Sequence, residues 1–302
     1  MTRSLVIINP HAGGGRARRV WQQHADYIRA RLGEVEAVET ASQDDVADVL
    51  RSASRRGVTR VISIGGDGTN HYSVNAILRH NQTHPHHPLT YASLPAGTGR
   101  DWSRGAAMPL DVPKAVDWIV NTRVRYVDVG RALLDGQERF FLNASSAGIS
   151  GEVVKRVEAS AKGGRVTYLK AILAALLAYR PTPMQIDVDG QRWFEGPVYL
   201  AAVCNGRFFG QGLKVAPDAE IDDGLFDMVA AGDLRLPVVL RLLQQMYRGA
   251  HIFSPHVRLR RGSTVTITNA SADPLGLDLD GEGAFAQQIA YSILPQALGM
   301  HT

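Results

Sequence analysis

The sequence predicts two domains: an α/β domain built on a mostly parallel sheet, followed by a domain that is mainly an antiparallel β-sandwich. Up to about residue 122, short apolar runs typical of buried strands alternate with segments whose apolar residues recur at helical spacing. Beyond that point, strand-like runs follow one another with few helices between them. Because parallel strands need crossover connections and antiparallel strands do not, the change in pattern predicts the change in architecture.

The first domain is expected to extend over residues 1–122. Its predicted strands are 5–9, 35–40, 58–64 and 89–94, and its predicted helices include 16–31 and 44–55. In the second helix Val46, Val49 and Leu50 recur at helical spacing, and Ser42 is a candidate N-cap. Repeated strand–helix–strand order predicts a sheet covered by helices on both faces.

The second domain is expected over residues 123–288. Its predicted strands are 124–134, 139–143, 185–188, 196–203, 225–230, 263–268 and 275–279, and its predicted helices are 164–179 and 237–248. Turn pairs such as Asp135-Gly136 and Asp189-Gly190 favour hairpins. We interpret the apolar repeat of helix 164–179 as core packing, with membrane contact through Arg165, Tyr168 and Lys170 as the alternative.

Composition excludes several protein classes. The chain has 302 residues, a net charge of +4 and one cysteine, Cys204, which cannot form an internal disulfide. A reducing, cytoplasmic setting is therefore expected. The longest apolar run, residues 169–178, is far shorter than the roughly 20 residues that span a bilayer. No dense basic stripe or known module indicates nucleic-acid binding, and the histidines of residues 79–88 are interpreted as part of a solvated loop.

The clearest chemical signal is Gly65-Gly66-Asp67-Gly68-Thr69, which follows the strand at 58–64 and precedes a helix. Glycines let the backbone approach a phosphate, and a helix N-terminus offers it N–H donors and a positive dipole end. Ligands of open α/β sheets bind beyond the carboxyl ends of the strands, where this loop lies. We predict a phosphate site with Asp67 as a ligand or water-holder for Mg²⁺. A tight turn capped by Asp67 is the alternative.

A second loop, Pro95-Ala96-Gly97-Thr98-Gly99-Arg100-Asp101, repeats this arrangement after the strand at 89–94. The two loops can face one another across a nucleotide, with Thr98 as a hydroxyl donor and Asp101 as a second acid near the metal. A third glycine-rich turn follows Asn9, where a simple turn and a phosphate contact both remain open. Because the chain contains no GxxxxGK[ST] sequence, we exclude a P-loop mechanism.

Two acidic turns occur in the second half. Residues 217–225 place carboxylates and carbonyls close together, as a hard cation requires, although a solvated turn fits equally well. In Asp280-Gly281-Glu282-Gly283, Glu282 projects from a glycine-flanked turn. Phosphoryl transfer needs a base for the acceptor hydroxyl, and a carboxylate on such a turn suits that role. An ordinary hairpin tip is the alternative.

In this order, and along nearly the whole chain, these segments resemble the diacylglycerol kinase catalytic family, which also contains sphingosine kinases and bacterial lipid kinases. The matching segments are Asn9-Pro10, residues 65–69, 95–101 and 217–225, and Asp280-Gly281-Glu282. Residues 289–298, which include Leu294-Pro295, also resemble the closing segment of the family, so residues 289–302 are expected to return to the first domain. The resemblance implies a first domain similar to those of NAD kinase and phosphofructokinase.

The resemblance implies ATP as phosphate donor, Mg²⁺ as cofactor and a lipid alcohol such as diacylglycerol as acceptor. Carried over by position, it implies that the nucleotide is bound by Asn9, Thr40, Gly65, Gly66, Asp67, Gly68, Thr69, Gly97 and Thr98. It places Asp67 and Asp101 near the catalytic metal and makes Glu282 the general base. A structural Mg²⁺ would be held by Asp223 with the backbone carbonyls of Glu220 and Leu225.

Two positions depart from the family pattern. After the pentapeptide the family usually has an Asn-Glu pair, whereas this chain reads Asn70-His71-Tyr72, with Tyr72 where a carboxylate is expected. In the second loop the family has asparagine before the aspartate, and this chain has Arg100. Both changes bear on nucleotide geometry or on the choice of acceptor.

The resemblance also implies transient contact with the inner face of a membrane and no nucleic-acid partner. The oligomeric state stays open, a dimer included. An NAD kinase is one alternative, because those enzymes use a GGDG loop on a similar plan. The other is a non-catalytic nucleotide or lipid sensor on the same scaffold, which would bind ATP without turnover.

Overall fold

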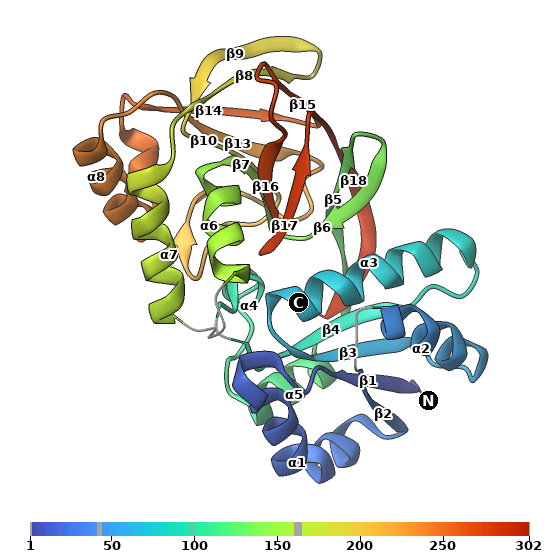
Figure 1. Cartoon of the computed structure of the whole chain (residues 1–302). Coiled ribbons are helices and arrows are strands. Elements are labelled where there is room, and N and C mark those ends of the chain that lie inside the picture. Colours follow the sequence, from blue (N-terminus) through green and yellow to red (C-terminus); the bar gives the residue numbers. More distant parts are fainter. Residues whose placement is uncertain (1, 41–43, 98, 160–164, 302) are drawn as a thin grey trace. The chain divides into compact units, whose positions relative to one another are not determined.

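Two units make up the chain in the computed structural model, which describes residues 2–40, 44–97, 99–159 and 165–301 (Figure 1). Unit 1 contains the residues up to Val127 and those from Gln296 onward, and unit 2 contains Asp128–Pro295. The sequence-based boundary lay at residues 122/123, with a return at 289. Both boundaries of the units lie inside strands, one in the strand at 124–134 and one in the last strand of the chain. The sequence pattern does not change within a strand, so it could not mark either boundary.

The sheet of unit 1 is mostly parallel, as predicted. Its strands are β1 (Ser4–Ile8), β2 (Val35–Glu39), β3 (Arg60–Gly65) and β4 (Thr90–Pro95), in the order β2-β1-β3-β4. Met300, near the end of β18 (Gln288–His301), pairs in parallel with Tyr91. Every residue of β1 and β3 is buried, because helices cover both faces.

The helices of unit 1 form two pairs (Figure 1). On one face lie α1 (Ala12–Leu32) and α5 (Val112–Asn121), which was not predicted, and on the other lie α2 (Asp44–Arg55) and α3 (Asp67–Thr83). The short helix α4 (Asp101–Gly105) follows the second glycine loop. The interpretation of residues 79–88 as a loop was wrong in part, because α3 continues to Thr83 and buries His80 against Ser54. Ser42 lies outside the described residues.

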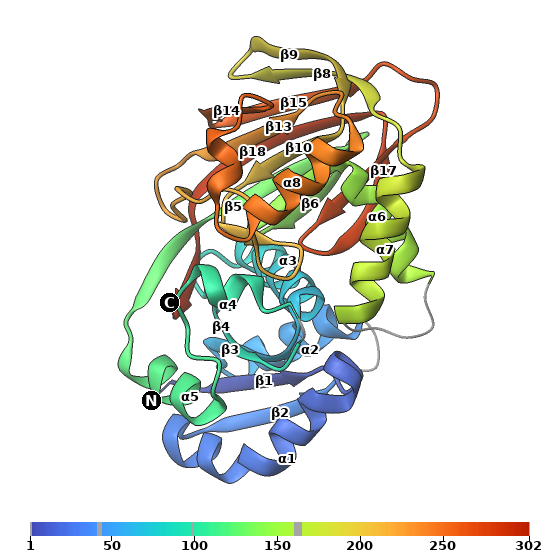
Figure 2. The ribbon, with the colours of Figure 1, turned by 90° about the vertical axis from the view of Figure 1, so that its left-hand side faces the viewer.

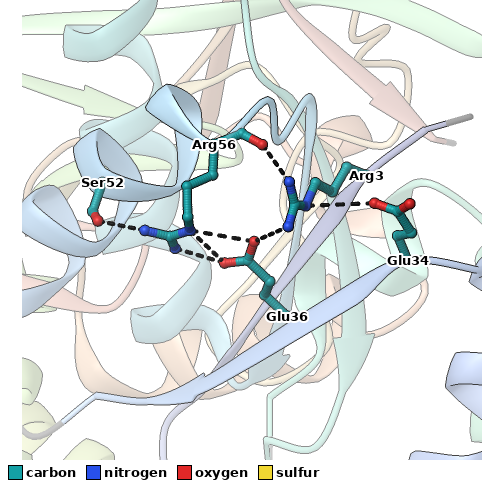
Figure 3. A network of polar contacts seen from close by, with 5 residues as sticks. All are labelled: Arg3, Glu34, Glu36, Ser52 and Arg56. Atoms are coloured by element: carbon teal, nitrogen blue, oxygen red, sulfur yellow. Dashed lines mark hydrogen bonds and ion pairs between the residues drawn. The ribbon is translucent and has the colours of Figure 1, made fainter.

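A polar network joins the outer edge of this sheet to α2 (Figure 3). Glu36 of β2 accepts a hydrogen bond of 2.6 Å from Arg56 and lies 3.2 Å from Arg3. Hydrogen bonding from Arg56 lowers the pKa of Glu36. Arg56 also donates to Ser52, and Arg3 lies 3.6 Å from Glu34, so charged side chains line this edge strand.

Unit 2 is a two-sheet antiparallel sandwich, as predicted. One sheet has the order β18, β15 (Thr264–Asn269), β8 (Thr182–Val188), β9 (Gln191–Val198). In the same sheet β5 (Val124–Leu134) pairs with β18 and with β6 (Gln137–Phe141). The second sheet has the order β14 (Val257–Gly262), β13 (Phe226–Ala231), β10 (Leu200–Cys204), β7 (Ala144–Gly148), β16 (Leu275–Leu279), β17 (Glu282–Ala286). In the core between the sheets Phe141 stacks on Phe226 and meets the ring of Tyr291 edge-to-face.

Three helices and several short elements complete unit 2. They are α6 (Ile149–Glu158), α7 (Arg165–Ala178), α8 (Leu236–Met246), the 3₁₀ turn η1 (Ala250–Phe253) and the small hairpin of β11 (Phe208–Phe209) and β12 (Leu213–Lys214). The helices lie outside the sheets (Figure 2). In the described part of the chain, no helix is both long enough and apolar enough to cross a bilayer.

Several predictions for unit 2 were confirmed and others were wrong. Asp135-Gly136 and Asp189-Gly190 have positive φ at both residues, as two-residue hairpin turns require. The single strand expected at 196–203 is two strands, because the chain breaks at Tyr199 between β9 and β10, which belong to different sheets. Elements α6, β7, β14 and β17 were not predicted.

Candidate active site

Two glycine-rich loops meet beyond the carboxyl ends of β3 and β4. The backbone N–H groups of Ala96 and Gly97 both donate to the carbonyl of Gly65 at 2.8 Å. A Cβ atom on Gly97 would lie 2.3 Å from Cα of Gly66, so only glycine fits there. Helix α3 begins at Asp67, directly after Gly66. Because glycines precede the N-terminus of this helix, an anion can come close to its backbone N–H groups.

The two acids that the sequence placed near a metal lie together in unit 1. The backbone N–H of Asp101 donates to Oδ1 of Asp67 at 3.2 Å. A Cβ atom on Gly99 would lie 2.3 Å from Oδ2 of Asp67 and 3.7 Å from Oδ2 of Asp101, so both carboxylates border the same space. Arg104 donates to Asp101 at 3.1 Å. Two adjoining carboxylates are a donor set that suits Mg²⁺.

Asn9 joins the third glycine-rich turn to the first loop. Its Nδ2 donates to Oγ1 of Thr69 at 3.1 Å, and its Oδ1 accepts from the N–H of His11. Thr40 follows β2 and donates through its N–H to the carbonyl of Ile8 at 3.0 Å. The carboxyl ends of four neighbouring strands therefore bring these predicted residues to one edge of the sheet. Thr98 lies outside the described residues.

Three arginines surround the second loop, and their association was not visible in the sequence. Arg100 has a left-handed φ of 59°, and its Nε donates to the carbonyl of Gly97 at 3.0 Å. Arg104 donates to the carbonyl of Gly99. Burial lowers the pKa of Arg100, and the charges of Arg16 and Arg104 lower it further. Guanidinium groups gathered at a glycine loop suit a polyphosphate.

Asn70 fastens the start of α3 to the sheet. Its Oδ1 accepts hydrogen bonds from the hydroxyls of Ser63, Tyr91 and Ser93 at 3.0, 2.8 and 2.9 Å, all of them buried. Tyr72, which replaces the expected carboxylate, is half-buried and meets the His71 ring edge-on at 5.4 Å. The aromatic replacement is therefore packed on α3.

In unit 2 a buried aspartate that the sequence analysis missed holds the acidic turn of residues 217–225. Asp128 of β5 is fully buried. Its Oδ2 accepts from the N–H of Gly224, and its N–H donates to the carbonyl of Ile221, both at 2.7 Å. Because β5 is remote in sequence from this turn, spacing alone could not reveal the connection.

The acidic turn carries a carboxylate that pairs with an arginine. Oδ1 of Asp223 accepts from the N–H of Leu225 at 3.0 Å, and its Oδ2 pairs with Arg261. Arg261 also lies 3.5 Å from Asp227, and burial raises the pKa of that carboxyl. Oδ2 of Asp227 is buried without a hydrogen-bond partner among the described residues. The described residues contain no group of three or more metal-ligating side chains, so the positive charge beside Asp223 and Asp227 is that of Arg261.

Glu282 is the first residue of β17, directly after the turn Asp280-Gly281, and pairs with Leu279. The Asp280 carboxylate accepts from the N–H groups of residues 142, 143 and 144 at 2.6, 2.9 and 3.1 Å. Positive φ at Asp280 and Gly281 makes the turn tight. Asp280 thus anchors the turn before Glu282 and fixes the position of Glu282 at the start of β17.

One buried amide connects the two acidic turns of unit 2. Nδ2 of Asn205 donates to the carbonyls of Asp128 at 3.0 Å and Leu142 at 2.7 Å. Asp128 holds the acidic turn, and Leu142 belongs to the segment that Asp280 binds. Asn205 could not be found from the sequence, since a single asparagine after an apolar strand carries no signal of its own.

Unit 2 also contains an apolar cavity of about 110 Å³ between α6, α7, α8 and the second sheet. Most of its lining is aliphatic, as in Val153, Ile172 and Leu242. Three of its lining residues have a side-chain atom that is buried without a hydrogen-bond partner among the described residues: Ser150 Oγ, Tyr199 OH and His251 Nδ1. Each of these atoms is enclosed by protein atoms, so none of them faces the open space. Nε2 of His251 donates to the carbonyl of Val215, which leaves Nδ1 as an acceptor. The lining of the cavity suits an apolar group.

Residues 3–132 match the diacylglycerol kinase catalytic domain, and residues 143–302 match the "YegS C-terminal NAD kinase beta sandwich-like domain". A diacylglycerol kinase of Bacillus subtilis (strain 168) is 28% identical over 293 residues, covering 93% of this chain and 90% of that protein. A Shewanella frigidimarina protein named "Probable lipid kinase YegS-like" is 30% identical over 260 residues, covering 83% of this chain and 80% of that one. The structure of a Bacillus anthracis diacylglycerol kinase shares the fold, with a TM-score of 0.72 at 21% identity over 99% of this chain and 96% of the other.

Proposed function

The chain belongs to the diacylglycerol kinase family of lipid kinases, and from this premise we propose that it transfers the γ-phosphate of ATP to the hydroxyl of a lipid alcohol such as diacylglycerol. ATP is the phosphate donor that a kinase family implies. The observation that carries the proposal is the contact between Asp67 and Asp101 beside two interlocked glycine loops. Phosphoryl transfer requires such positioning of phosphates and acids and little further protein chemistry.

The phosphates of ATP bind to the backbone N–H groups of the two loops and the start of α3, with Arg16, Arg100 and Arg104 around them. Asp67 and Asp101 would hold Mg²⁺, which when bound offsets the negative charge of the phosphates. Glu282 accepts the proton of the lipid hydroxyl. The oxygen of that hydroxyl bonds to the γ-phosphorus, and ADP leaves with the bridging oxygen.

The lipid acceptor is supported by the cavity of unit 2. Its aliphatic lining is matched to a hydrocarbon chain. A nucleotide acceptor such as NAD carries phosphates, for which the lining of the cavity has no lysine or arginine.

The test is turnover of labelled ATP with Mg²⁺ and a panel of lipid alcohols in mixed micelles, with NAD in a separate reaction. We expect label in one lipid, and a loss of about a thousandfold in kcat for Asp67→Asn and for Glu282→Gln, within the range that acid–base and electrostatic groups contribute. Glu282→Gln should bind ATP normally, and the exposed Asp26→Asn on α1 serves as a matched control.

Other outcomes would contradict the proposal. Label in NAD would make the protein an NAD kinase. ATP binding without turnover in any reaction, unchanged by Glu282→Gln, would make it a sensor. If either variant catalyses phosphoryl transfer at nearly the native rate, the substituted residue takes no part in the mechanism.

A further inference from the structure

Unit 2 has a second hollow, of about 290 Å³, beside α8. One wall consists of side chains on one face of α8: Val238, Arg241, Leu242 and Gln245. The other wall is formed by Ala250 and by residues 253–256, in and just after η1. Among the described residues only Leu242 also lines the apolar cavity, so the hollow is a separate space that the proposed function does not use.

The wall that carries η1 is held in a fixed shape by the chain itself. Gly249 adopts a left-handed φ of 73°, which turns the chain from α8 into η1. His251 is buried, and its ring bonds to the carbonyl of Val215 at 2.9 Å. The N–H of Ser254 donates to the carbonyl of His251 at 3.0 Å, and the N–H of His256 donates to Oγ of Ser254 at 3.3 Å. The hollow is therefore formed before any ligand arrives, as most small-molecule sites are.

Phe253 offers a flat apolar surface at this hollow. It is 85% exposed, more than any other large apolar residue among those described. Because hydrogen bonds fix the turn around it, the ring is carried by an ordered backbone. An exposed aromatic ring in the lining of a hollow can stack on the flat ring of a ligand.

The charge of the hollow favours an anion. Its lining contains Arg241 and His256 and no aspartate or glutamate. Arg241 is exposed and forms no hydrogen bond or ion pair within the described part of the chain. Residues 234–272 contain six arginines and no acid, so this segment supplies no counter-charge of its own. An unpaired guanidinium can donate two N–H groups at once to a phosphate or a carboxylate.

We propose that this hollow, the α8 pocket, binds a small soluble phosphate ester of a flat-ring compound, the chemical class of the nucleoside monophosphates. Arg241 binds the phosphate, and the ring of Phe253 stacks on the ring of the ligand. Val238 and Leu242 pack against the apolar edge of that ring. The α8 pocket belongs entirely to unit 2, so it is a second ligand site beside the phosphate loops of unit 1, and it stands whether or not the proposed function does.

Equilibrium dialysis of the full-length chain with labelled adenosine monophosphate (AMP) tests the α8 pocket. We expect Arg241→Gln and Phe253→Ala each to weaken binding at this site about tenfold, since one loses the charge and the other the stacking surface. Both residues are exposed, so neither substitution should change the melting temperature. The matched control is Arg235→Gln, at an exposed arginine just before α8 that does not line the hollow, which should bind AMP as the native chain does. Inorganic phosphate, which has no ring, should compete at least about tenfold less well than AMP.

Photolabelling with 8-azido-AMP locates the bound ligand, because AMP can also enter the phosphate loops of unit 1. We expect label in residues 236–258 of the native chain and much less label there in Phe253→Ala, whereas any label in residues 65–101 should be equal in both.

Several outcomes would overturn the α8 pocket. Native protein that binds no AMP, label confined to unit 1, or variants that bind AMP like the native chain would each do so. A control that weakens binding as much as Arg241→Gln would reduce the binding to general charge attraction. Phosphate that competes as well as AMP would show that the hollow recognises no ring. Either of these last two results also contradicts the proposal.

Discussion

Arg100 shows how a single residue can change a phosphate site while the fold around it stays the same. The family resemblance led us to expect asparagine at this position. The arginine adopts a left-handed φ, binds the carbonyl of Gly97, and lies near enough to Arg16 and Arg104 for their charges to lower its pKa. Three like charges around a glycine loop repel one another until an anion is bound, so the cluster favours phosphate binding.

We predict that Arg100→Asn raises the KM for ATP about three- to tenfold and changes kcat little, because the guanidinium binds the phosphates equally in the ground state and the transition state. Asparagine tolerates a left-handed φ, so the loop should keep its shape. Steady-state kinetics with varied ATP measures the change, and Arg55→Asn at the end of α2 is the control. An unchanged KM would show that Arg100 does not contact the nucleotide.

Arg261 is the second residue with a testable charge role. It pairs with Asp223 and lies 3.5 Å from the buried Asp227. We predict that Arg261→Ala lowers the melting temperature by several degrees in EDTA, because two neighbouring carboxylates lose their cation. Magnesium should then stabilise the variant more than the native chain, since it binds the vacated oxygens.

Thermal unfolding with EDTA and with millimolar Mg²⁺ measures this difference. Arg260→Ala, on the same strand, provides the control, since Arg260 binds Gln191 and no acid of the turn. If both variants respond to Mg²⁺ as the native chain does, the acidic turn is no cation site.

At the scale of the elements, α3 depends on Asn70 for its position over the sheet. The Asn70 Oδ1 receives three hydroxyl groups from β3 and β4. We predict that Asn70→Ala destabilises the protein by about 2–4 kcal/mol, because it leaves buried hydroxyls without an acceptor. Urea unfolding measures the loss, and Gln82→Ala, at an exposed position of α3, should cost less than about 0.5 kcal/mol. Equal effects of the two variants would show that α3 is held by apolar packing alone.

At the scale of the whole molecule, the chain passes between the two units in β5 and again in β18. The last residues of β18 complete the sheet of unit 1, where Leu298 and Met300 are fully buried. We predict that Met300→Ala lowers the stability of unit 1 by about 2–5 kcal/mol, the usual result of truncating a buried side chain.

Urea unfolding followed by tryptophan fluorescence reports this loss, because three of the four tryptophans (Trp21, Trp102 and Trp118) belong to unit 1. Leu259→Ala, at an exposed leucine of unit 2, is the control. A variant as stable as the control would mean that β18 is dispensable for the sheet of unit 1.

The sequence by itself determined the fold class and the phosphate loops. Apolar strands, helical spacing and turn pairs such as Asp135-Gly136 depend on neighbouring residues, so they can be recognised before any tertiary contact is known. The loops at 65–69 and 95–101 are likewise continuous segments that follow strands. Since parallel neighbours bring their carboxyl ends to one edge, the meeting of Asp67 with Asp101 followed from the order of the strands.

Only the tertiary structure decided which distant side chains act together and which apolar faces stay open. Asp128, Asn205 and Asp280 form one support for the two acidic turns, although nothing in the segments around Asp128 and Asn205 marks these two residues. Helix α7 carries apolar residues on both of its faces, so its sequence indicated burial, whereas Val166, Leu169, Leu173 and Leu177 are exposed. The local sequence pattern shows which side chains are apolar and so can be buried. The residues that cover them come from elsewhere in the chain.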